Sequence, residues 1–197
     1  MKPMHEMEFC KFQSAASDRE TLRFVEALYM SAFPPEERRP FSEIVALTES
    51  SPCFSLLLLR EAGHAVGFLS YWQWERLAYI EHFALSPDCR GRGLGSSALA
   101  AFCASVGCPV VLEVEPPTAE AARRRIAFYR RAGFVAAPQR YVQPPYSAGL
   151  PPVELLLMAY GAVDWARDFD AVRDLLHREV YGAEPMSPRG SCRGGSK

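Results

Sequence analysis

The sequence lacks a strong charge of either sign, because 22 lysines and arginines and 23 aspartates and glutamates give a formal net charge of -1. Whole-chain electrostatics therefore favours neither a nucleic-acid partner nor an acidic membrane surface, and any basic site must be local. Long hydrophobic runs are also missing, since the longest aliphatic stretch, Leu56 to Leu59, is far too short to span a bilayer. The first twelve residues, MKPMHEMEFCKF, contain no apolar segment typical of a signal peptide. We expect a cytoplasmic protein that binds neither nucleic acid nor membrane.

Cysteine motifs are absent as well. The six cysteines form no C-x-x-C pair and no zinc-like quartet, so no metal site is expected. With 197 residues, of which 49% are hydrophobic, the chain is long enough to bury a core without disulfides. We expect one domain over residues 1–182, followed by a disordered tail over residues 183–197.

The hydrophobic pattern that is present predicts alternating strands and helices. Apolar residues at helical spacing predict helices over residues 18–32, 93–106, 119–132 and 165–180. Runs rich in β-forming residues predict strands over residues 53–60, 64–74, 77–86, 108–115, 134–146 and 152–160. The first three strands read as an antiparallel meander, and the following strand, helix and strand require a right-handed crossover. The fold class is therefore α/β, with a mixed, mostly antiparallel sheet and a C-terminal helix.

A glycine-rich turn, CRGRGLGSS at residues 89–97, joins a predicted strand to a predicted helix. At such a turn free backbone N–H groups and the positive end of the helix dipole converge, which suits an anion. Arg90 and Arg92 would add charge-assisted contacts to a phosphate-bearing cofactor. A P-loop is excluded because no G-K-[ST] follows, and a dinucleotide fingerprint is incomplete because Ser96 stands where a third glycine or alanine belongs. A solvated glycine turn remains the alternative.

Two motifs in this order, with a strand between them, carry a family resemblance. Arg90, Gly93 and Gly95 meet the pattern R/Q-x-x-G-x-G/A, and Phe128 and Tyr129 begin a pattern in which FY is followed by GF. The chain thereby resembles the GNAT superfamily of acyl-CoA N-acyltransferases, roughly over residues 7–160. One departure is Ala122, which stands where many members carry an asparagine that contacts pantetheine. Arg124 or Arg125 could bind phosphate in compensation, or could simply form a solvated helix face.

The resemblance implies a central sheet of about seven strands flanked by helices, and acetyl-CoA as the cosubstrate. The strand before the turn, the turn itself and the second motif would then contact acetyl-CoA. The contact residues that we expect are Phe83, Ala84, Leu85, Arg90, Gly91, Arg92, Gly93, Leu94, Gly95, Ser96 and Phe128.

Acetyl transfer from a thioester to an amine needs a neutral amine, a polarised carbonyl and a proton for the departing thiolate. An alkyl ammonium has a pKa of about 10.4, so a base must remove its proton. Glu81 is the candidate base, because alternation along its strand would place it on one face with Phe83 and Leu85, and the alternative is an exposed glutamate on a half-solvated strand. Tyr129 is the candidate acid, because a phenol of pKa about 10 can protonate a thiolate. The resemblance also implies a bulged strand whose N–H near Leu85 donates to the thioester oxygen.

The acceptor is less defined by the sequence. Carboxylates that could attract a cationic amine are Glu36, Glu37, Glu113 and Glu115, and aromatic residues that could wall a cleft are Trp72, Trp74, Tyr141 and Tyr146. His82 is expected to be structural, on the face opposite Glu81, and Cys89 to be a spectator.

These residues together predict an N-acetyltransferase that moves acetyl from acetyl-CoA to a primary amine, small or in a peptide, by direct attack in a ternary complex. The alternative is a non-catalytic CoA-binding or protein-interaction module of the same fold. A homodimer could form through the C-terminal helix and the closing strands.

Overall fold

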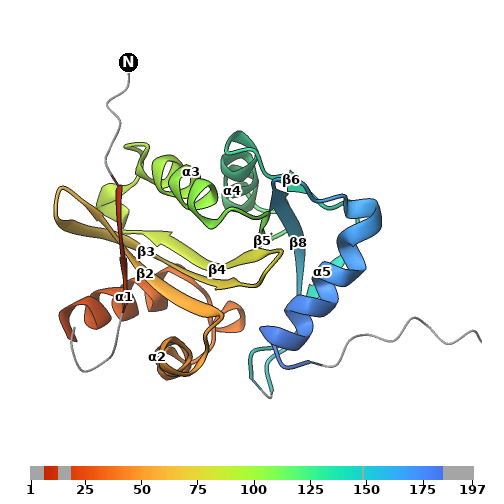
Figure 1. Ribbon diagram of the computed structural model, residues 1–197, viewed down its shortest axis with the longest axis horizontal. Helices are drawn as coiled ribbons and strands as arrows, with labels where there is room; N and C mark the ends of the chain where they lie inside the picture. The colour runs from red at the N-terminus through yellow and green to blue at the C-terminus, as the bar shows by residue number, and fades with distance from the viewer. Residues whose placement is uncertain (1–6, 13–18, 148, 184–197) are drawn as a thin grey trace, which may run out of the picture.

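The computed structural model describes residues 7–12, 19–147 and 149–183. An eight-stranded sheet runs through the molecule (Figure 1). Its strands are β1 (Met7–Lys11), β2 (Phe54–Glu61), β3 (His64–Gln73), β4 (Ala78–Leu85), β5 (Val110–Val114), β6 (Val135–Ala136), β7 (Tyr141–Gln143) and β8 (Val153–Tyr160). The predicted α/β class with a mixed, mostly antiparallel sheet is confirmed. The prediction of a disordered tail falls on residues outside the described ranges, apart from Ala183.

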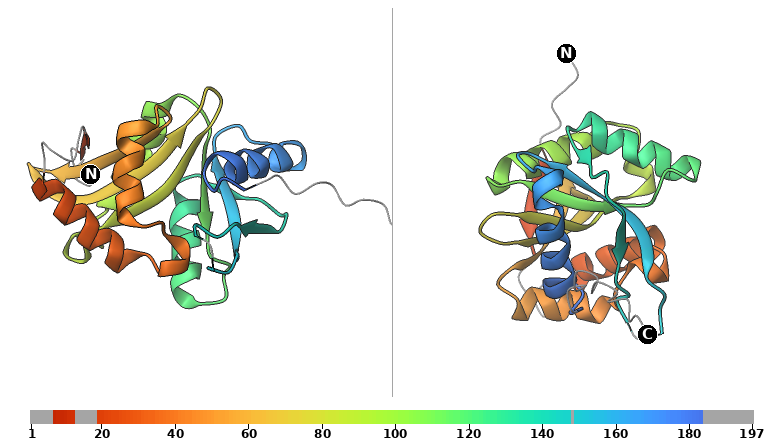
Figure 2. Two further views of the ribbon diagram at one scale, coloured as in Figure 1. Left: turned by 90° about the horizontal axis from the view of Figure 1, so that it is seen from below. Right: turned by 90° about the vertical axis from the view of Figure 1, so that its right-hand side faces the viewer.

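Helices cover both faces of the sheet. They are α1 (Arg19–Ala32), α2 (Phe41–Ser50), α3 (Leu94–Val106), α4 (Glu120–Arg131) and α5 (Trp165–Glu179), with short 3-10 turns η1 (Pro35–Glu37) and η2 (Pro87–Cys89). One core cluster joins the sheet to α1, α2 and α5, and the other joins it to α3 and α4. Figures 1 and 2 show α3 and α4 on one side of the sheet and α1 and α2 on the other.

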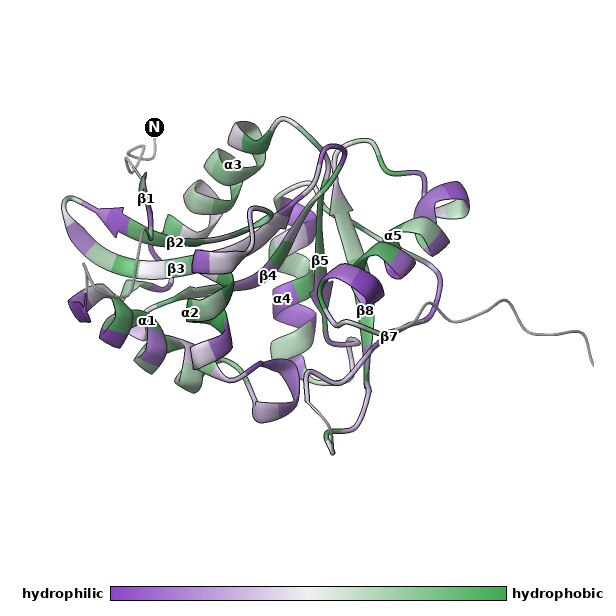
Figure 3. Ribbon diagram, turned by 60° about the horizontal axis from the view of Figure 1, so that its bottom comes forward, coloured by the Kyte–Doolittle hydropathy of each residue, from purple (hydrophilic) through white to green (hydrophobic). Residues whose placement is uncertain are grey.

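This layering explains the hydrophobic pattern of the sequence. The stretch from Leu56 to Leu59 is buried throughout, because strands covered on both faces have no solvated side. In α5, by contrast, only one stripe is apolar, and Trp165, Phe169 and Leu176 on it pack into the core of their own chain. Figure 3 shows hydrophobic and hydrophilic residues alternating along α1 and α5 accordingly. The apolar face of α5 is therefore already covered, and the homodimer stays a prediction.

The strand order decides where the sheet opens. The strands β1 to β4 pair antiparallel in sequence, and the turn between β2 and β3 uses positive φ at Ala62 (49°) and Gly63 (78°), as tight hairpins require. After the α3 crossover, β5 pairs with β4 in parallel, but only Ala78–Ile80 pairs, with Val110–Leu112. Beyond this short ladder the two strands separate.

Two elements are not predicted by the sequence pattern. The strand β1 is short and lies at the sheet edge, where only partial burial leaves no clear alternation. The helix α2 follows Pro40 and buries Ile44 alone, so its apolar stripe is weak. Among the described residues, no helix is both long and apolar enough to cross a membrane.

Candidate active site

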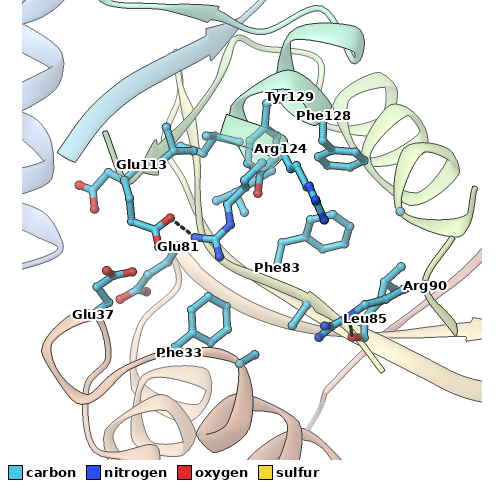
Figure 4. A pocket seen from close by; sticks show the side chains of 18 of the residues that line it. Phe33, Glu37, Glu81, Phe83, Leu85, Arg90, Glu113, Arg124, Phe128 and Tyr129 are labelled. Carbon is cyan, nitrogen blue, oxygen red and sulfur yellow. Dashed lines mark hydrogen bonds and ion pairs between the residues drawn. The ribbon is translucent and has the colours of Figure 1, made fainter. Parts of the chain in front are cut away.

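A cavity of about 950 Å³ lies where β4 and β5 separate. Its walls come from β4, the glycine turn, β5, α4 and the segment that follows α1. Figure 4 shows three carboxylates, Glu37, Glu81 and Glu113, toward one end, and Arg90 and Leu85 toward the other. This volume is typical of sites that bind small molecules and cofactors.

The glycine turn forms the cationic end of the cavity. Gly93 is the N-cap of α3 with φ 88°, and no side chain caps the helix. The N–H groups of the first turn of a helix have no partner within the helix, so here they are free to bind a ligand. Gly91, at φ 77°, also adopts a conformation that suits glycine. These N–H groups, the helix dipole and Arg90 make this end cationic, and their donors suit an anion.

Most of the predicted acetyl-CoA contacts line this one cavity. They are Phe83, Ala84, Leu85, Arg90, Gly91, Gly93, Gly95, Ser96 and Phe128, joined by the two catalytic candidates Glu81 and Tyr129. Two predicted contacts do not line it. Arg92 turns away and pairs with Glu61 at 2.9 Å, and Leu94 is fully buried beneath the turn in the core of α3. Arg124 and Arg125 line the cavity, and Arg125 pairs with Glu115.

The free edge of β4 presents backbone groups to the cavity. The N–H of Ser86 donates to the Val66 carbonyl of β3 at 2.9 Å. Since backbone groups alternate along a strand, Ala84 also turns its N–H toward β3, whereas Phe83 and Leu85 turn theirs toward the cavity. The Leu85 carbonyl, which accepts from Arg90 Nε at 3.1 Å, agrees with this direction.

A bulge lies at Glu81, four residues before Leu85. Ser70 pairs with His82 and Tyr71 pairs with Ile80, which leaves Glu81 as the extra residue of β4. The prediction that Glu81 shares a face with Phe83 and Leu85 is therefore wrong, as is the prediction that His82 lies on the opposite face. Glu81 and His82 both face α1, because the bulge interrupts the alternation.

Glu81 makes strong contacts that the sequence does not reveal. Its Oε1 accepts from Arg39 Nε at 3.0 Å and from Arg39 Nη2 at 2.7 Å, and its Oε2 accepts from Trp72 Nε1 at 2.8 Å. Burial by itself would raise the pKa of Glu81, but the Arg39 guanidinium outweighs it, so the pKa is lowered below its usual value. A lowered pKa weakens Glu81 as a base.

Glu113 has the opposite electrostatic environment. Burial raises the pKa of its carboxyl to about 7, although tyrosine hydroxyls that donate to it oppose the shift. Tyr141 donates to one carboxylate oxygen, and Tyr181 donates to the other at 2.7 Å. Tyr79 lies 3.1 Å from the Tyr181 hydroxyl and extends this network. A carboxyl with a pKa near neutrality can both accept and release a proton at physiological pH.

The remaining candidates divide by position. Glu37 lines the cavity, and burial together with the nearby Glu115 raises its pKa. Tyr129 is only 8% exposed and lines the cavity between its two ends, and burial raises its pKa to about 12. Glu36 is exposed outside the cavity. Of the aromatic candidates Tyr146 lines the cavity, whereas Trp72, Trp74 and Tyr141 do not. The rings of Trp72 and Trp74 stack on each other with their centres 6.1 Å apart.

His82 is buried and neutral. Burial lowers its pKa to about 4, its Nδ1 lies 3.1 Å from Ser70 Oγ, and its ring packs edge-on to Tyr29 and Phe33. These contacts favour the structural role expected of it. Cys89 is a free thiol at the end of η2.

The eight-stranded sheet opens between its two parallel strands, and the uncapped N-terminus of α3 lies at the opening, so the fold is an α/β fold with a ligand-sized cavity at the split of its sheet. The sequence model of the acetyltransferase (GNAT) family matches residues 22–134. A solved structure assigned to the GNAT family of acetyltransferases, from Bacteroides thetaiotaomicron, is 36% identical, with a TM-score of 0.85 over 90% of this chain and 99% of that one. The chain belongs to the GNAT family of acetyltransferases.

More distant structures share the fold alone. A chimera of the spermidine N-acetyltransferase SpeG from Vibrio cholerae and hSSAT is 16% identical, with a TM-score of 0.57 over 78% of this chain and 94% of that one. The ribosomal-protein-S18-alanine N-acetyltransferase of Escherichia coli is 18% identical, with a TM-score of 0.53 over 81% of this chain and 97% of that one. No curated protein matches the chain. Family membership supports acyl-CoA-dependent acetyl transfer as the general activity.

Proposed function

We propose that the protein is an N-acetyltransferase that moves the acetyl group of acetyl-CoA to a primary amine by direct attack in a ternary complex. The observation that carries this proposal is the polarity of one cavity, with an anion-binding end at the glycine turn and a carboxylate end at Glu37 and Glu113. An anionic cofactor and a cationic amine would enter such a cavity from opposite ends. Their reacting groups would then meet between those ends, close to Tyr129 and the free edge of β4.

Acetyl-CoA would bind with its pyrophosphate on the N-terminus of α3 and Arg90. Its pantetheine arm would follow the free edge of β4 toward the bulge. The N–H groups of Phe83 and Leu85 point to that side, so one of them would donate to the thioester oxygen and stabilise the negative charge that develops there.

The amine would bind as an ammonium at the carboxylate end and lose a proton before it attacks. The sequence predicts Glu81 as the base, but its ion pair with Arg39 favours another carboxylate. We therefore propose Glu113, which has a pKa of about 7 and lines the same cavity, acting directly or through one water. Glu37 would hold the ammonium group by charge.

In the transfer step, the amine nitrogen forms a bond to the thioester carbonyl carbon and the carbon–sulfur bond breaks. The proton that the ammonium loses goes to Glu113, and the departing thiolate takes a proton from the Tyr129 hydroxyl. Because burial raises the pKa of Tyr129 to about 12, this hydroxyl is protonated at neutral pH and the phenolate then regains a proton from the attacking nitrogen or water. No protein nucleophile is needed, so Cys89 stays a spectator.

Binding is tested by calorimetric titration with acetyl-CoA. We expect micromolar affinity, which Arg90→Ala and Gly93→Ala weaken by about tenfold or more. Arg92→Ala is the matched control, because this neighbouring arginine pairs with Glu61 and does not line the cavity. A folded protein that binds no acetyl-CoA would overturn the proposal, as would equal losses for Arg92→Ala and Arg90→Ala.

Turnover separates the enzyme from the non-catalytic module of the same fold. The assay incubates the protein with acetyl-CoA and a panel of alkylamines, diamines and peptides with a free amino terminus. Acetylated product is detected by mass spectrometry, because the exposed Cys10 and other free thiols would react with thiol reagents. Acetyl-CoA binding without product from any amine would favour the module.

A further inference from the structure

A buried arginine, Arg39, ties three separate parts of the chain together. It lies between η1 and α2 and is only 8% exposed. Its guanidinium makes two hydrogen bonds to Glu81 and donates through Nη2 to the Val180 carbonyl at 3.1 Å. It also lies 4.8 Å from the centre of the Tyr146 ring. An arginine buried in this way needs an anionic partner. The close and buried partner is Glu81 on β4, because Glu43 lies 3.8 Å from the guanidinium and its side chain is half exposed.

The partner, Glu81, occupies the position at which β4 changes direction. It is the extra residue of the bulge, and the last residue of β4 that pairs with β5 is Ile80, immediately before it. The cavity therefore opens at Glu81, and the edge at Phe83 and Leu85 begins there. The Glu81 side chain is completely buried, so Arg39 and Trp72 hold its carboxylate in place.

We propose that Arg39 is a positioning residue for acetyl transfer, which acts through Glu81 to fix the bulge of β4 and the cavity-facing N–H groups of Phe83 and Leu85. This inference rests on the proposed function. Without the guanidinium, the buried Glu81 carboxylate loses its cation and has to move or take up a proton. Either change shifts the bulge, and with it the donors that face the thioester oxygen.

The test is a double-mutant cycle of Arg39→Met, Glu81→Gln and the double variant, assayed with acetyl-CoA and the amine that wild type acetylates fastest. We expect Arg39→Met to lower kcat by about tenfold or more and to change KM for acetyl-CoA by less than about threefold, because the pyrophosphate end is untouched. The double variant should recover most of the lost kcat, because it no longer contains an uncompensated buried charge.

Arg38→Met is the matched control. This adjacent arginine donates to the Met30 and Phe33 carbonyls at 2.6 and 2.9 Å and does not touch β4, so kcat should stay near the wild-type value. If Arg39→Met does not fold, the comparison of Glu81→Gln with the double variant still tests the proposal, because both variants lack the buried Glu81 carboxylate. If that carboxylate were the catalytic base, both variants would lose kcat by about a hundredfold or more, and this result would overturn the proposal.

A spectroscopic measurement separates this inference from the proposed function. In two-dimensional amide NMR spectra, the Phe83 and Leu85 resonances should shift in Arg39→Met and return toward their wild-type positions in the double variant. This holds even if wild type acetylates none of the amines, a result that would refute the proposed function alone. Unmoved Phe83 and Leu85 resonances in Arg39→Met would overturn the positioning role, whatever the activity.

Discussion

Gly67 of β3 offers a sharp test of how tightly the C-terminal half of β4 packs against β3. It pairs with Leu85, and a Cβ added at Gly67 would lie 2.3 Å from the Ala84 carbonyl oxygen and 3.1 Å from the Leu85 Cα. Both of these atoms are backbone, so no rotamer change relieves the contact. The substitution Gly67→Ala must therefore push β4 away from β3 at the residues that would hold the thioester.

The expected cost follows from these contacts. Overpacking costs about 1–3 kcal/mol, and a weakened hydrogen bond of the β3–β4 ladder adds about 1 kcal/mol. We expect a loss of about 3 kcal/mol, which for a domain of this size lowers Tm by roughly 6–12 °C. The assay is thermal unfolding followed by circular dichroism, with acetyl transfer measured on the same samples.

Gly63→Ala is the matched control, because it makes the same change with no atom within 4 Å of the added Cβ. Its positive φ of 78° costs about 1–2 kcal/mol, so Tm should fall by roughly 2–8 °C without loss of acetyl transfer. Equal melting temperatures and equal activities of the two variants would refute the close packing of β3 against the C-terminal half of β4.

Further predictions concern protons and charge. Tyr129→Phe should lower kcat by about a hundredfold or more while calorimetry gives an unchanged Kd for acetyl-CoA, and unchanged kcat would remove Tyr129 from the mechanism. Wild-type kcat should rise as pH rises through about 7, where Glu113 loses its proton, and a Glu113→Gln profile that keeps this rise would exclude Glu113 as the base. Glu37→Gln should raise KM for the amine, whereas Glu36→Gln, at the exposed neighbour, should not. Burial lowers the pKa of His82 to about 4. Between about pH 6.5 and 4, His82 is therefore protonated in the unfolded chain but not in the folded chain, so the free energy of unfolding should fall as pH falls through this range. Glu113 contributes to the free energy of unfolding with the opposite pH dependence, because burial raises its pKa. Urea titrations should therefore compare wild type with His82→Gln at several pH values. If the free energy of unfolding changes with pH in parallel for the two proteins, this would contradict a neutral buried histidine.

The sequence alone is sufficient to predict those parts of the structure that depend on residues close together in the chain. The helix that ends at Ala32, the meander and the α3 crossover follow from periodicity and turn residues, which are local properties of the chain. The glycine turn is equally local, because Gly93 both permits the left-handed φ and leaves the N-terminus of α3 uncapped. These features are enough to predict, without any tertiary contact, that the glycine turn lies at the N-terminus of a helix, and the turn lines the cavity.

The carboxylate end could not be predicted in the same way, because burial and long-range partners decide what each glutamate can do. Glu81 meets Arg39, 42 residues away, and Glu113 meets Tyr181, 68 residues away. Neither of these long-range pairings can be inferred from hydrophobic periodicity in the sequence. In addition, the bulge turns the Glu81 side chain toward α1, which is the opposite face to the one that simple strand alternation predicts. Two glutamates that look equivalent in the sequence thus differ in the folded chain, since a guanidinium lowers the pKa of one and burial raises the pKa of the other. In the proposed mechanism the choice of base is therefore a property of the tertiary fold, and variants at Glu81 and Glu113 should differ in their pH profiles of kcat even though each removes a single carboxylate.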